Sequence, residues 1–454
     1  SCHNLGTAAE NLQIGSSYQH WTLASFLVRA RWDYQGKYYA NIAIRTDGSS
    51  RLAAGNQWAF FPSGGVAWRI SEEKFFGKRE WLNSLKLRAS YGAVGNSAID
   101  PYQTIAGLSK YDYLFGEDAS NKFFAYRPSM IPNKDLGWEI SRTANFGVDF
   151  GLWNNRISGY IEGYITKTSD LLMERTLPFF TGFSKVWQNI GKTENKGIEL
   201  NIQANTLKTK SFSWETTVTF ARNWNKITEL LGGGDIRNNS WFIGKPLQVH
   251  YNYEMIGVWQ LGEEKEAQKY GAIPGDIKVK DQNNDGSIGE LDKVILGQKD
   301  PKIIASLLNS FRFGAFDASI NLNMNFGSLI HPNTYASLIT RDGLRWMPSN
   351  FKYWTPDNPT NEYTRADKLS GYDPFAGTGG YMKGDYIKIQ DITLGYDFSK
   401  IMPKNWKILR ARLYAQVRNL GYIYKACKND VSPEAPDFDY NIPTTYTMGI
   451  NIDF

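Results

Sequence analysis

The chain alternates between apolar and polar side chains over unusually long stretches. In residues 315–326 one face carries Phe316, Ala318, Ile320, Leu322, Met324 and Phe326, and the other carries Asp317, Ser319, Asn321, Asn323 and Asn325. A period of two residues predicts a β-strand whose two faces meet different surroundings.

Thirteen segments of this kind are predicted, and most of them run for ten to fourteen residues. They are residues 25–34, 37–47, 58–70, 83–92, 139–150, 155–166, 195–205, 211–224, 302–313, 315–326, 385–397, 406–418 and 444–454. Soluble strands peak at about five or six residues, whereas strands of about 9–11 residues with one apolar face are typical of outer-membrane barrels. The apolar positions change parity between Ile389 and Ile392, which predicts a β-bulge near Asp391.

The connections between these segments alternate between short and long. The short ones are 35–36, 151–154, 206–210, 314 and 398–405, with 71–82 of middling length, and the long ones are 93–138, 167–194, 225–301, 327–384 and 419–443, with 48–57 the shortest of that set. Bacterial barrels have short periplasmic turns and long extracellular loops, so we expect every long connection to face outside.

This orientation makes the first and the last predicted strand run inward. Complete single-chain bacterial barrels have an even number of strands, whereas this sequence predicts thirteen. We therefore expect an all-β chain that is the C-terminal part of a larger transmembrane antiparallel barrel. Residues 1–24 would be an extracellular loop segment, and residues 25–454 would form the barrel part.

Composition excludes several other classes of protein. Among 454 residues, 15% are aromatic and 21% are charged, which argues against disorder, and no apolar run approaches the about 20 residues of a membrane helix. Two cysteines, Cys2 and Cys427, cannot support a disulfide scaffold. The net charge of +6 is spread along the chain without a basic block, so nucleic acid is not an expected partner.

Several motifs resemble the SusC/RagA-type TonB-dependent transporters of Gram-negative outer membranes. The matching stretches are residues 32–38 (WDYQGKY), 45–51 (RTDGSSR), 61–63 (FPS), 67–73 (AWRISEE), 85–92 (LKLRASYG) with Gly95 and Asn96, 354–359 (WTPDNP) and the aromatic Phe454. The resemblance covers nearly the whole chain. It implies a barrel of about 22 strands around an N-terminal plug, a SusD-type lipoprotein lid and a TonB complex that drives import of a glycan or peptide.

Under this resemblance the N-terminal plug and the first strands would come from a companion part of the same transporter. Outer-membrane lipid would cover the apolar strand faces. Two alternatives stay open, a passive porin-like channel and a secreted glycan-binding β-protein or adhesin.

Residues 281–292 (DQNNDGSIGELD) fit the calcium loop of EF-hand proteins. Side-chain oxygens would come from Asp281, Asn283, Asp285 and Asp292, a carbonyl oxygen from Ser287, and Gly286 would allow the sharp turn. The flanks do not read as helices, since residues 275–280 are strand-like. The alternative is a loop held by Asx turns without a metal ion.

Aromatic residues in two long connections are candidates for contact with the ligand or the lid. They are Trp346, Phe351, Tyr353, Trp354, Tyr111 and Tyr113. Ring faces suit sugars as well as a protein lid, and internal packing of the loops is the alternative. They favour a glycan over a peptide without deciding between them.

Catalysis has little support in the sequence. The four histidines are His3, His20, His250 and His331, and none has the spacing of a metalloprotease or a catalytic triad. We therefore expect no enzyme.

Overall fold

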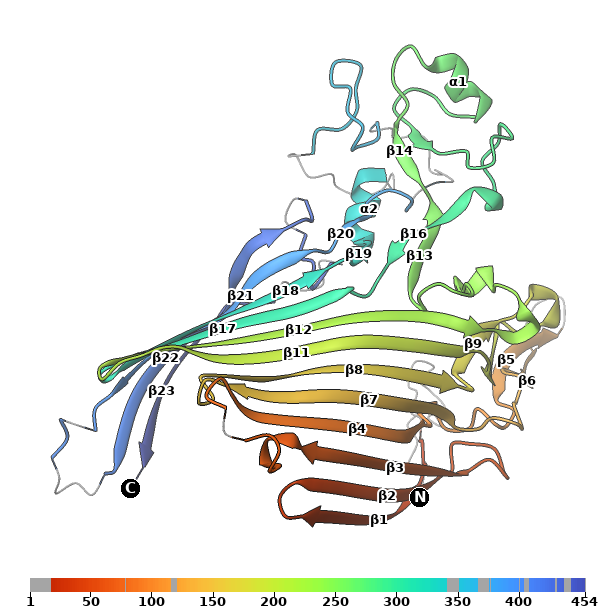
Figure 1. Cartoon of the computed structure of the whole chain (residues 1–454). Coiled ribbons are helices and arrows are strands. Elements are labelled where there is room, and N and C mark those ends of the chain that lie inside the picture. Colours follow the sequence, from red (N-terminus) through yellow and green to blue (C-terminus); the bar gives the residue numbers. More distant parts are fainter. Residues whose placement is uncertain are drawn as a thin grey trace.

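The computed structural model describes residues 18–77, 79–115, 121–340, 351–365, 375, 377–399, 401–403, 408–428, 431–436 and 442–453. Thirteen strands form one antiparallel sheet in which neighbours in the chain are neighbours in space (Figure 1). They are β1 (Leu23–Tyr34), β2 (Tyr38–Ser49), β3 (Trp58–Arg69), β4 (Leu82–Asn96), β7 (Glu139–Leu152), β8 (Ile157–Ser169), β11 (Lys192–Lys208), β12 (Phe212–Glu229), β17 (Ile303–Phe313), β18 (Phe316–Phe326), β21 (Tyr386–Asp397), β22 (Arg410–Lys425) and β23 (Thr445–Asp453). Each corresponds to one predicted segment, so the strand prediction is confirmed.

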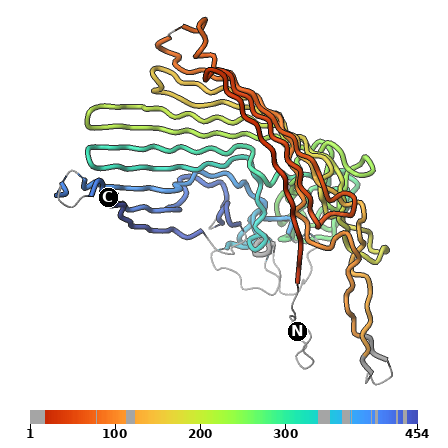
Figure 2. Tube along the Cα trace, turned by 90° about the horizontal axis from the view of Figure 1, so that it is seen from below, coloured from red at the N-terminus to blue at the C-terminus, as the bar shows by residue number. Residues whose placement is uncertain are grey.

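The sheet curves strongly but does not close (Figure 2). Its order runs from β1 to β23, and within the described ranges these two outer strands do not pair with each other. Both edges therefore expose backbone hydrogen-bonding groups along one side of a strand.

The two faces of the sheet differ in polarity, as the alternation predicts. On the apolar face, Val148, Ile161, Leu200 and Phe220 lie side by side in one row across four strands. On the polar face, Arg88 on β4 pairs with Asp149 on β7 (2.9 Å) and with Glu162 on β8 (2.5 Å). Such a division is stable when the apolar face meets lipid and the polar face meets water.

The predicted bulge lies on β21. The register with β18 shifts between Leu322–Ile389 and Asn321–Asp391, so Gln390 is the extra residue. Gln390 and Asp391 both reach Asn side chains of β18, since Asn323 bonds to Gln390 (3.3 Å) and Asn321 bonds to Asp391 (3.2 Å). The bulge therefore keeps the isoleucines on the apolar face and adds one residue to the polar face.

Short connections lie at one end of the strands and long connections lie at the other end, as predicted. The short ones are residues 35–37, 70–81, 153–156, 209–211, 314–315 and 398–409, and the long ones are 50–57, 97–138, 170–191, 230–302, 327–385 and 426–444. Short strands in the long connections are β5 (Leu108–Phe115), β6 (Asn121–Pro128), β9 (Leu172–Thr176), β10 (Lys185–Asn189), β13 (Val249–Tyr253), β14 (Met255–Val258), β15 (Ile277–Val279), β16 (Lys293–Gln298), β19 (Leu329–Ile330) and β20 (Met382–Lys383). Helices are α1 (Glu264–Lys269), α2 (Asn333–Thr340), η2 (Ile70–Glu72), η3 (Phe179–Thr181), η4 (Leu231–Gly233), η5 (Arg237–Asn239) and η6 (Glu290–Asp292). Among the described residues, no helix is long and apolar enough to cross a membrane.

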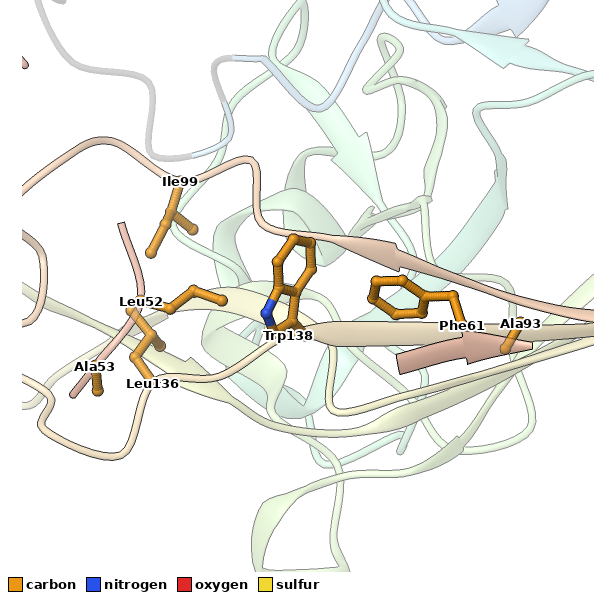
Figure 3. Close-up of a cluster of buried hydrophobic side chains, with 7 residues drawn as sticks. All are labelled: Leu52, Ala53, Phe61, Ala93, Ile99, Leu136 and Trp138. Carbon is orange, nitrogen blue, oxygen red and sulfur yellow. The ribbon is translucent and has the colours of Figure 1, made fainter. Parts of the chain in front are cut away.

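A compact apolar core lies at the long-connection end of β3, β4 and β7 (Figure 3). It contains Leu52, Ala53, Phe61, Ala93, Ile99, Leu136 and Trp138. The rings of Phe61 and Trp138 meet edge to face with centroids 5.4 Å apart, and Trp138 Nε1 donates to the carbonyl oxygen of Gln57 over 2.8 Å. This core fixes the bases of the first two long connections to the wall.

Candidate functional site

The two longest connections, residues 230–302 and 327–385, lie together above the sheet (Figure 1). Side-chain hydrogen bonds join them. The indole Nε1 of Trp354 donates to Oε1 of Gln260 over 2.9 Å. Nε2 of Gln260 donates to the carbonyl oxygen of Thr360 over 3.2 Å, and the backbone N–H of Val258 donates to Oδ1 of Asn361 over 3.2 Å. Trp354 is only 6% exposed, so this contact excludes water and joins the two connections into one body.

A second junction of the same connections lies around Gly275. Arg365 donates from Nε to Asp276 Oδ1 and from its backbone N–H to the carbonyl oxygen of Gly275, both over 2.8 Å. Gly275 has φ +93°, and a Cβ atom there would lie 2.6 Å from Trp354 Cε3. Only glycine fits this position, because both the backbone conformation and the space exclude a side chain.

The predicted contact residues near Trp354 pack together as a cluster of rings. The centroid of Phe351 lies 5.0 Å from that of Tyr363, 5.8 Å from that of Tyr335 and 6.1 Å from that of Tyr353. Phe351 and Tyr353 are half-buried, so part of each ring is accessible. Trp346 lies outside the described residues. Contact of Phe351 and Tyr353 with a ligand or a lid stays a prediction.

Tyr111 and Tyr113 belong to a separate feature, the β5–β6 hairpin, which projects away from the sheet (Figure 2). Tyr111 is 42% exposed, and the guanidinium of Arg127 lies 4.0 Å from its ring centroid. Tyr113 lies opposite Phe123 in the hairpin register. The hairpin thus offers rings on a different connection from the Phe351 cluster.

Two histidines lie where β13 meets β19. Nε2 of His250 donates to the carbonyl oxygen of Leu329 over 2.9 Å, and Nε2 of His331 donates to that of Gly379 over 3.1 Å. The ring of Tyr381 packs against both, with centroids 5.1 Å from His250 and 4.2 Å from His331. Burial lowers the pKa of His250 to about 4, so this imidazole is neutral at pH 7.

The loop at 281–292 uses its carboxylates to hold its own backbone. Asp281 accepts from the backbone N–H groups of Asn284 (2.6 Å) and Gly286 (2.9 Å), and Asp292 accepts from those of Gln282 (2.8 Å) and Gly289 (2.7 Å). Hydrogen bonds from Ser287 and Asn283 lower the pKa of Asp285. Within the described parts of the chain, no group of three or more His, Cys, Asp or Glu side chains could hold a metal ion. The backbone N–H of Asp285 donates to Oδ1 of Asn283 (3.0 Å) and that of Ser287 donates to Oδ1 of Asp285 (2.8 Å), so the loop contains two Asx turns.

The polar face of the sheet carries a basic hollow. It has a volume of about 420 Å³ and is lined by Arg29, Arg31, Lys86 and Arg88 among others. Lys86 lies 3.4 Å from Asp149, which also binds Arg88. This arrangement can hold acidic or hydrogen-bonding groups, but it contains no nucleophile paired with a base.

A family model described as "TonB dependent receptor-like, beta-barrel" matches residues 4–420. The chain belongs to this family of TonB-dependent receptors. Members lie in the outer membrane of Gram-negative bacteria and are receptors and transporters rather than enzymes. This location sets the orientation of the wall, since the long connections of outer-membrane barrels are extracellular.

Curated TonB-dependent receptors match over almost the whole chain. TonB-dependent receptor P26 of Formosa agariphila is 30% identical over 97% of this chain and 47% of its own length. TonB-dependent receptor SusC of Bacteroides thetaiotaomicron is 29% identical over 95% of this chain and 44% of its own length. The chain therefore spans about half the length of the curated TonB-dependent receptors that it matches.

Solved structures share the fold of this receptor chain. The RagAB peptide transporter superposes with a TM-score of 0.77 at 23% identity, over 96% of this chain and 48% of that one. The RagAB peptide importer in its "closed-closed" state gives a TM-score of 0.78 at 24% identity, with the same coverage.

Sequence reasoning missed the residues that join the extracellular loops of this receptor. Gln260, Asn361 and the Asp276–Arg365 pair follow no periodic pattern, and their partners are about 90 to 100 residues away in the chain. Gly275 was within a stretch predicted as strand-like, but its crowding by Trp354 depends on tertiary structure. No local signal could have identified them.

Proposed function

We propose that this chain forms the wall and the extracellular loops of an active importer that carries glycans or peptides across the outer membrane. The observation that carries the proposal is the sheet itself, whose apolar face suits lipid and whose polar face carries a network of charges. Loops joined into one body lie over its extracellular end, where a substrate would arrive. A polar wall combined with ordered loops favours selective uptake over simple filtration.

The proposal includes a plug and further strands supplied by another part of the same transporter. Support comes from the two open sheet edges at β1 and β23 and from relatives about twice as long. Polar-face residues such as Arg29, Arg31 and Arg88 would then face the plug. Mass mapping of the transporter purified from outer membranes should detect plug peptides in the same complex, and a complex without them would contradict this arrangement.

Energy would come from a TonB complex, and a SusD-type lipoprotein would act as the lid over the extracellular loops. These partners are proposed from the similarity to SusC and from the RagAB fold. Phe351, Tyr353 and Trp346, with Tyr111 and Tyr113 of the hairpin, are the residues that we propose for contact with the ligand or the lid. Trp354 is buried, so we propose that it supports these residues through Gln260 instead of making the contact itself. Ring faces stack on sugars and equally on apolar peptide side chains, so both substrate classes belong to the proposal.

Uptake by intact cells tests the function directly. Cells with and without the gene would be given labelled oligosaccharides or oligopeptides, with and without an uncoupler of the proton-motive force. The proposal expects gene-dependent uptake of one substrate class that stops when the uncoupler is added. Uptake that persists in uncoupled cells would instead identify a passive, porin-like channel.

We also propose that the loop at 281–292 binds one calcium ion through Asp281, Asn283, Asp285, the carbonyl of Ser287 and Asp292. The spacing of its oxygen donors and the positive φ of Gly286 (+83°) support this assignment. Because Asp281 and Asp292 accept from backbone N–H groups and the three carboxylates do not converge in the structure, ion binding would turn these side chains toward the ion. Calcium content of the purified transporter would be compared with that of Asp285→Ala and of the control Asp300→Ala, which lies outside the loop. The site requires that only Asp285→Ala loses one ion, and equal content in all three would leave the loop as an Asx-turn structure.

A further inference from the structure

The apolar face of the sheet changes character at its extracellular end between β7 and β12. Because side chains directly opposite in the register share a face, the strand pairing defines rows that run across β7, β8, β11 and β12. Three successive rows are Phe150–Gly159–Ile202–Val218, Val148–Ile161–Leu200–Phe220 and Phe146–Gly163–Ile198–Arg222. These three rows form the apolar band. The one cation in them is Arg222 on β12, in the row nearest the extracellular side.

The next rows toward the extracellular side are charged. They read Ala144–Ile165–Lys196–Trp224, then Arg142–Lys167–Glu194–Lys226, then Ile140–Ser169–Lys192–Glu229. We name Arg142, Lys167, Lys192, Lys196 and Lys226 the basic belt. Within these three rows the basic belt meets two carboxylates, Glu194 and Glu229. All five cations are exposed.

The carboxylates neutralise one side of the basic belt and leave the other side uncompensated. Glu194 lies 3.1 Å from Lys196 and 3.3 Å from Lys226, and Glu229 lies 2.7 Å from Lys192. Arg142 donates to the hydroxyl of Ser169 over 3.3 Å, and in the described parts of the chain neither Arg142 nor Lys167 forms an ion pair. Two cations directly opposite each other repel. Lys167 also lies opposite Glu194 in the register, but Glu194 is paired with Lys196 and Lys226, so an external anion would stabilise the Arg142–Lys167 pair.

A hollow on the same face lies at this position. Its volume is about 680 Å³, and its lining includes Tyr91, Arg142, Ile165, Lys167, Lys192 and Glu194. The lower rim is therefore apolar and aromatic, and the upper rim is cationic. Since neighbouring strands are about 4.8 Å apart, Arg142 and Lys167 are spaced to share one phosphate group. The whole charged row, which includes Glu194, extends for about 14 Å and leaves room for a sugar head group beside that phosphate.

We propose that the basic belt binds the phosphorylated head group of a glycolipid in the outer leaflet, with Arg142 and Lys167 contacting the phosphate. The belt lies directly above the lipid-covered rows, on the extracellular side, so its neighbour is the head-group layer of the outer leaflet. Acyl chains of the same lipid would lie along the rows of Phe146, Ile161 and Leu200. This inference rests on the outer-membrane location of the chain and not on what the transporter carries.

The test uses the full-length transporter purified from outer membranes and stripped of lipid in detergent. Native mass spectrometry would measure binding of phosphorylated lipid A, of the same lipid after enzymatic removal of its phosphate, and of phosphorylated lipid A in the presence of millimolar inorganic phosphate. The variants are Arg142→Gln with Lys167→Gln, the charge-conserving Arg142→Lys with Lys167→Arg, and the control Lys208→Gln with Lys210→Gln. The control removes two charges at the periplasmic end of β11, Lys208 in the strand and Lys210 in the turn that follows it.

We expect the double glutamine variant to bind phosphorylated lipid A about tenfold more weakly or worse, because each lysine or arginine near a head-group layer contributes to attraction. The charge-conserving variant and the turn control should bind as the native protein does, and dephosphorylated lipid A should bind weakly to all of them. Unheated gel mobility would report barrel assembly, and the single variant Lys167→Gln, with a smaller loss, replaces the double variant if that variant fails to assemble.

Three results would overturn the proposal. Equal binding of phosphorylated lipid A by the native and the glutamine variants would show that the belt does not contact the lipid. Equal binding of the dephosphorylated lipid would show that apolar contact alone is responsible. Displacement of the lipid by millimolar phosphate would identify a site for the free anion instead.

Discussion

Trp354 donates its indole N–H to the side-chain oxygen of Gln260 over 2.9 Å, although the two residues are 94 positions apart in the chain. The same glutamine donates to the carbonyl oxygens of Val258 and Thr360. One buried side-chain contact therefore couples the β14 segment to the connection that precedes β21. Loops joined in this way move together or not at all, which matters for any lid that rests on them.

Replacing Trp354 with Phe should loosen this junction without affecting the wall. The change keeps a ring but leaves Oε1 of Gln260 without its donor, at a cost of about 1–2 kcal/mol in local stability. Amide hydrogen exchange in residues 258–260 and 354–361 should rise about tenfold, while exchange in β11 and β12 stays unchanged. Trp81→Phe, at a tryptophan that is 52% exposed, is the control, and similar exchange in both variants would contradict the coupling.

Gly275→Ala should disturb the same junction through backbone strain and a steric clash. Gly275 and Gly262 have nearly the same positive φ, +93° and +91°, but a Cβ atom has nothing within 4 Å at Gly262 and lies 2.6 Å from Trp354 at Gly275. Both alanine variants carry the strain of about 1 kcal/mol, and only Gly275→Ala displaces the indole. Fluorescence of the tryptophans should change in Gly275→Ala alone, and an equal change in both variants would exclude the clash as its cause.

Loss of Arg88 should destabilise the polar wall measurably. Arg88 binds Asp149 and Glu162 from a side chain that is 31% exposed, so Arg88→Gln leaves two carboxylates without their shared cation. We expect a loss of about 1–2 kcal/mol, between the values for surface and buried pairs. The temperature at which unheated gel mobility is lost reports this change.

The matched control for Arg88 is Arg69→Gln. Arg69 lies 3.8 Å from Glu72, and both side chains are about half exposed, so its loss should change stability by less than about 0.5 kcal/mol. The double variant Arg88→Gln with Glu162→Gln should regain part of the loss, because Glu162 loses its cation in Arg88→Gln whereas Asp149 keeps Lys86. If Arg88→Gln and Arg69→Gln lost their unheated gel mobility at the same temperature, water in the lumen would screen the charge network completely.

The contact of His250 with Leu329 should weaken as the medium becomes acidic. In the folded protein the pKa of His250 is about 4, below the ordinary value of 6.5. When the β13–β16 hairpin opens and exposes His250, the imidazole therefore takes up a proton at a higher pH than it does in the folded state. Stability from this group is complete above pH 6.5 and falls as the pH drops toward about 4. The ratio of exchange rates in β13 between the native protein and His250→Gln, measured at the same pH, should rise from pH 7 to pH 4.5. A constant ratio would mean that His250 does not titrate in this range.

The strands could be predicted from the sequence because the membrane imposes a period of two on every one of them. Residues such as Ile198, Leu200 and Ile202 face lipid and cannot be polar, so the pattern is strong even without neighbours. The prediction ended too early at the extracellular side, where β12 continues to Glu229 and β22 to Lys425. There the strands rise out of the apolar band, and outward positions such as Lys192 and Lys226 no longer differ in polarity from inward ones.

The extracellular loops could be predicted only by length and by local motifs. The strand-like stretch before the loop at 281–292 is confirmed by β15, and the parity change near Asp391 is confirmed by the bulge at Gln390. The β5–β6 and β13–β16 hairpins gave no periodic signal, since their side chains do not have one lipid face and one wet face. Their positions depend on contacts such as His250 with Leu329, which connect residues 79 positions apart.

The bulge at Gln390 also determines where the upper part of β21 is directed. Beyond it, Lys388 has a side chain that is only 4% exposed and lies 2.7 Å from Glu434, which also accepts from Tyr422. A bulge increases the local bend and twist of its strand, so the single extra residue turns this end of β21 toward the segment at 431–436. Deleting Gln390 would remove the bulge and straighten the strand, while Ile389 and Ile392 would keep facing the apolar side because they already lie opposite Leu322 and Ile320. The loss of the bend would free a segment of the extracellular mouth that is far from the bulge in the chain. One inserted residue in the wall thus determines the direction of an extracellular loop segment.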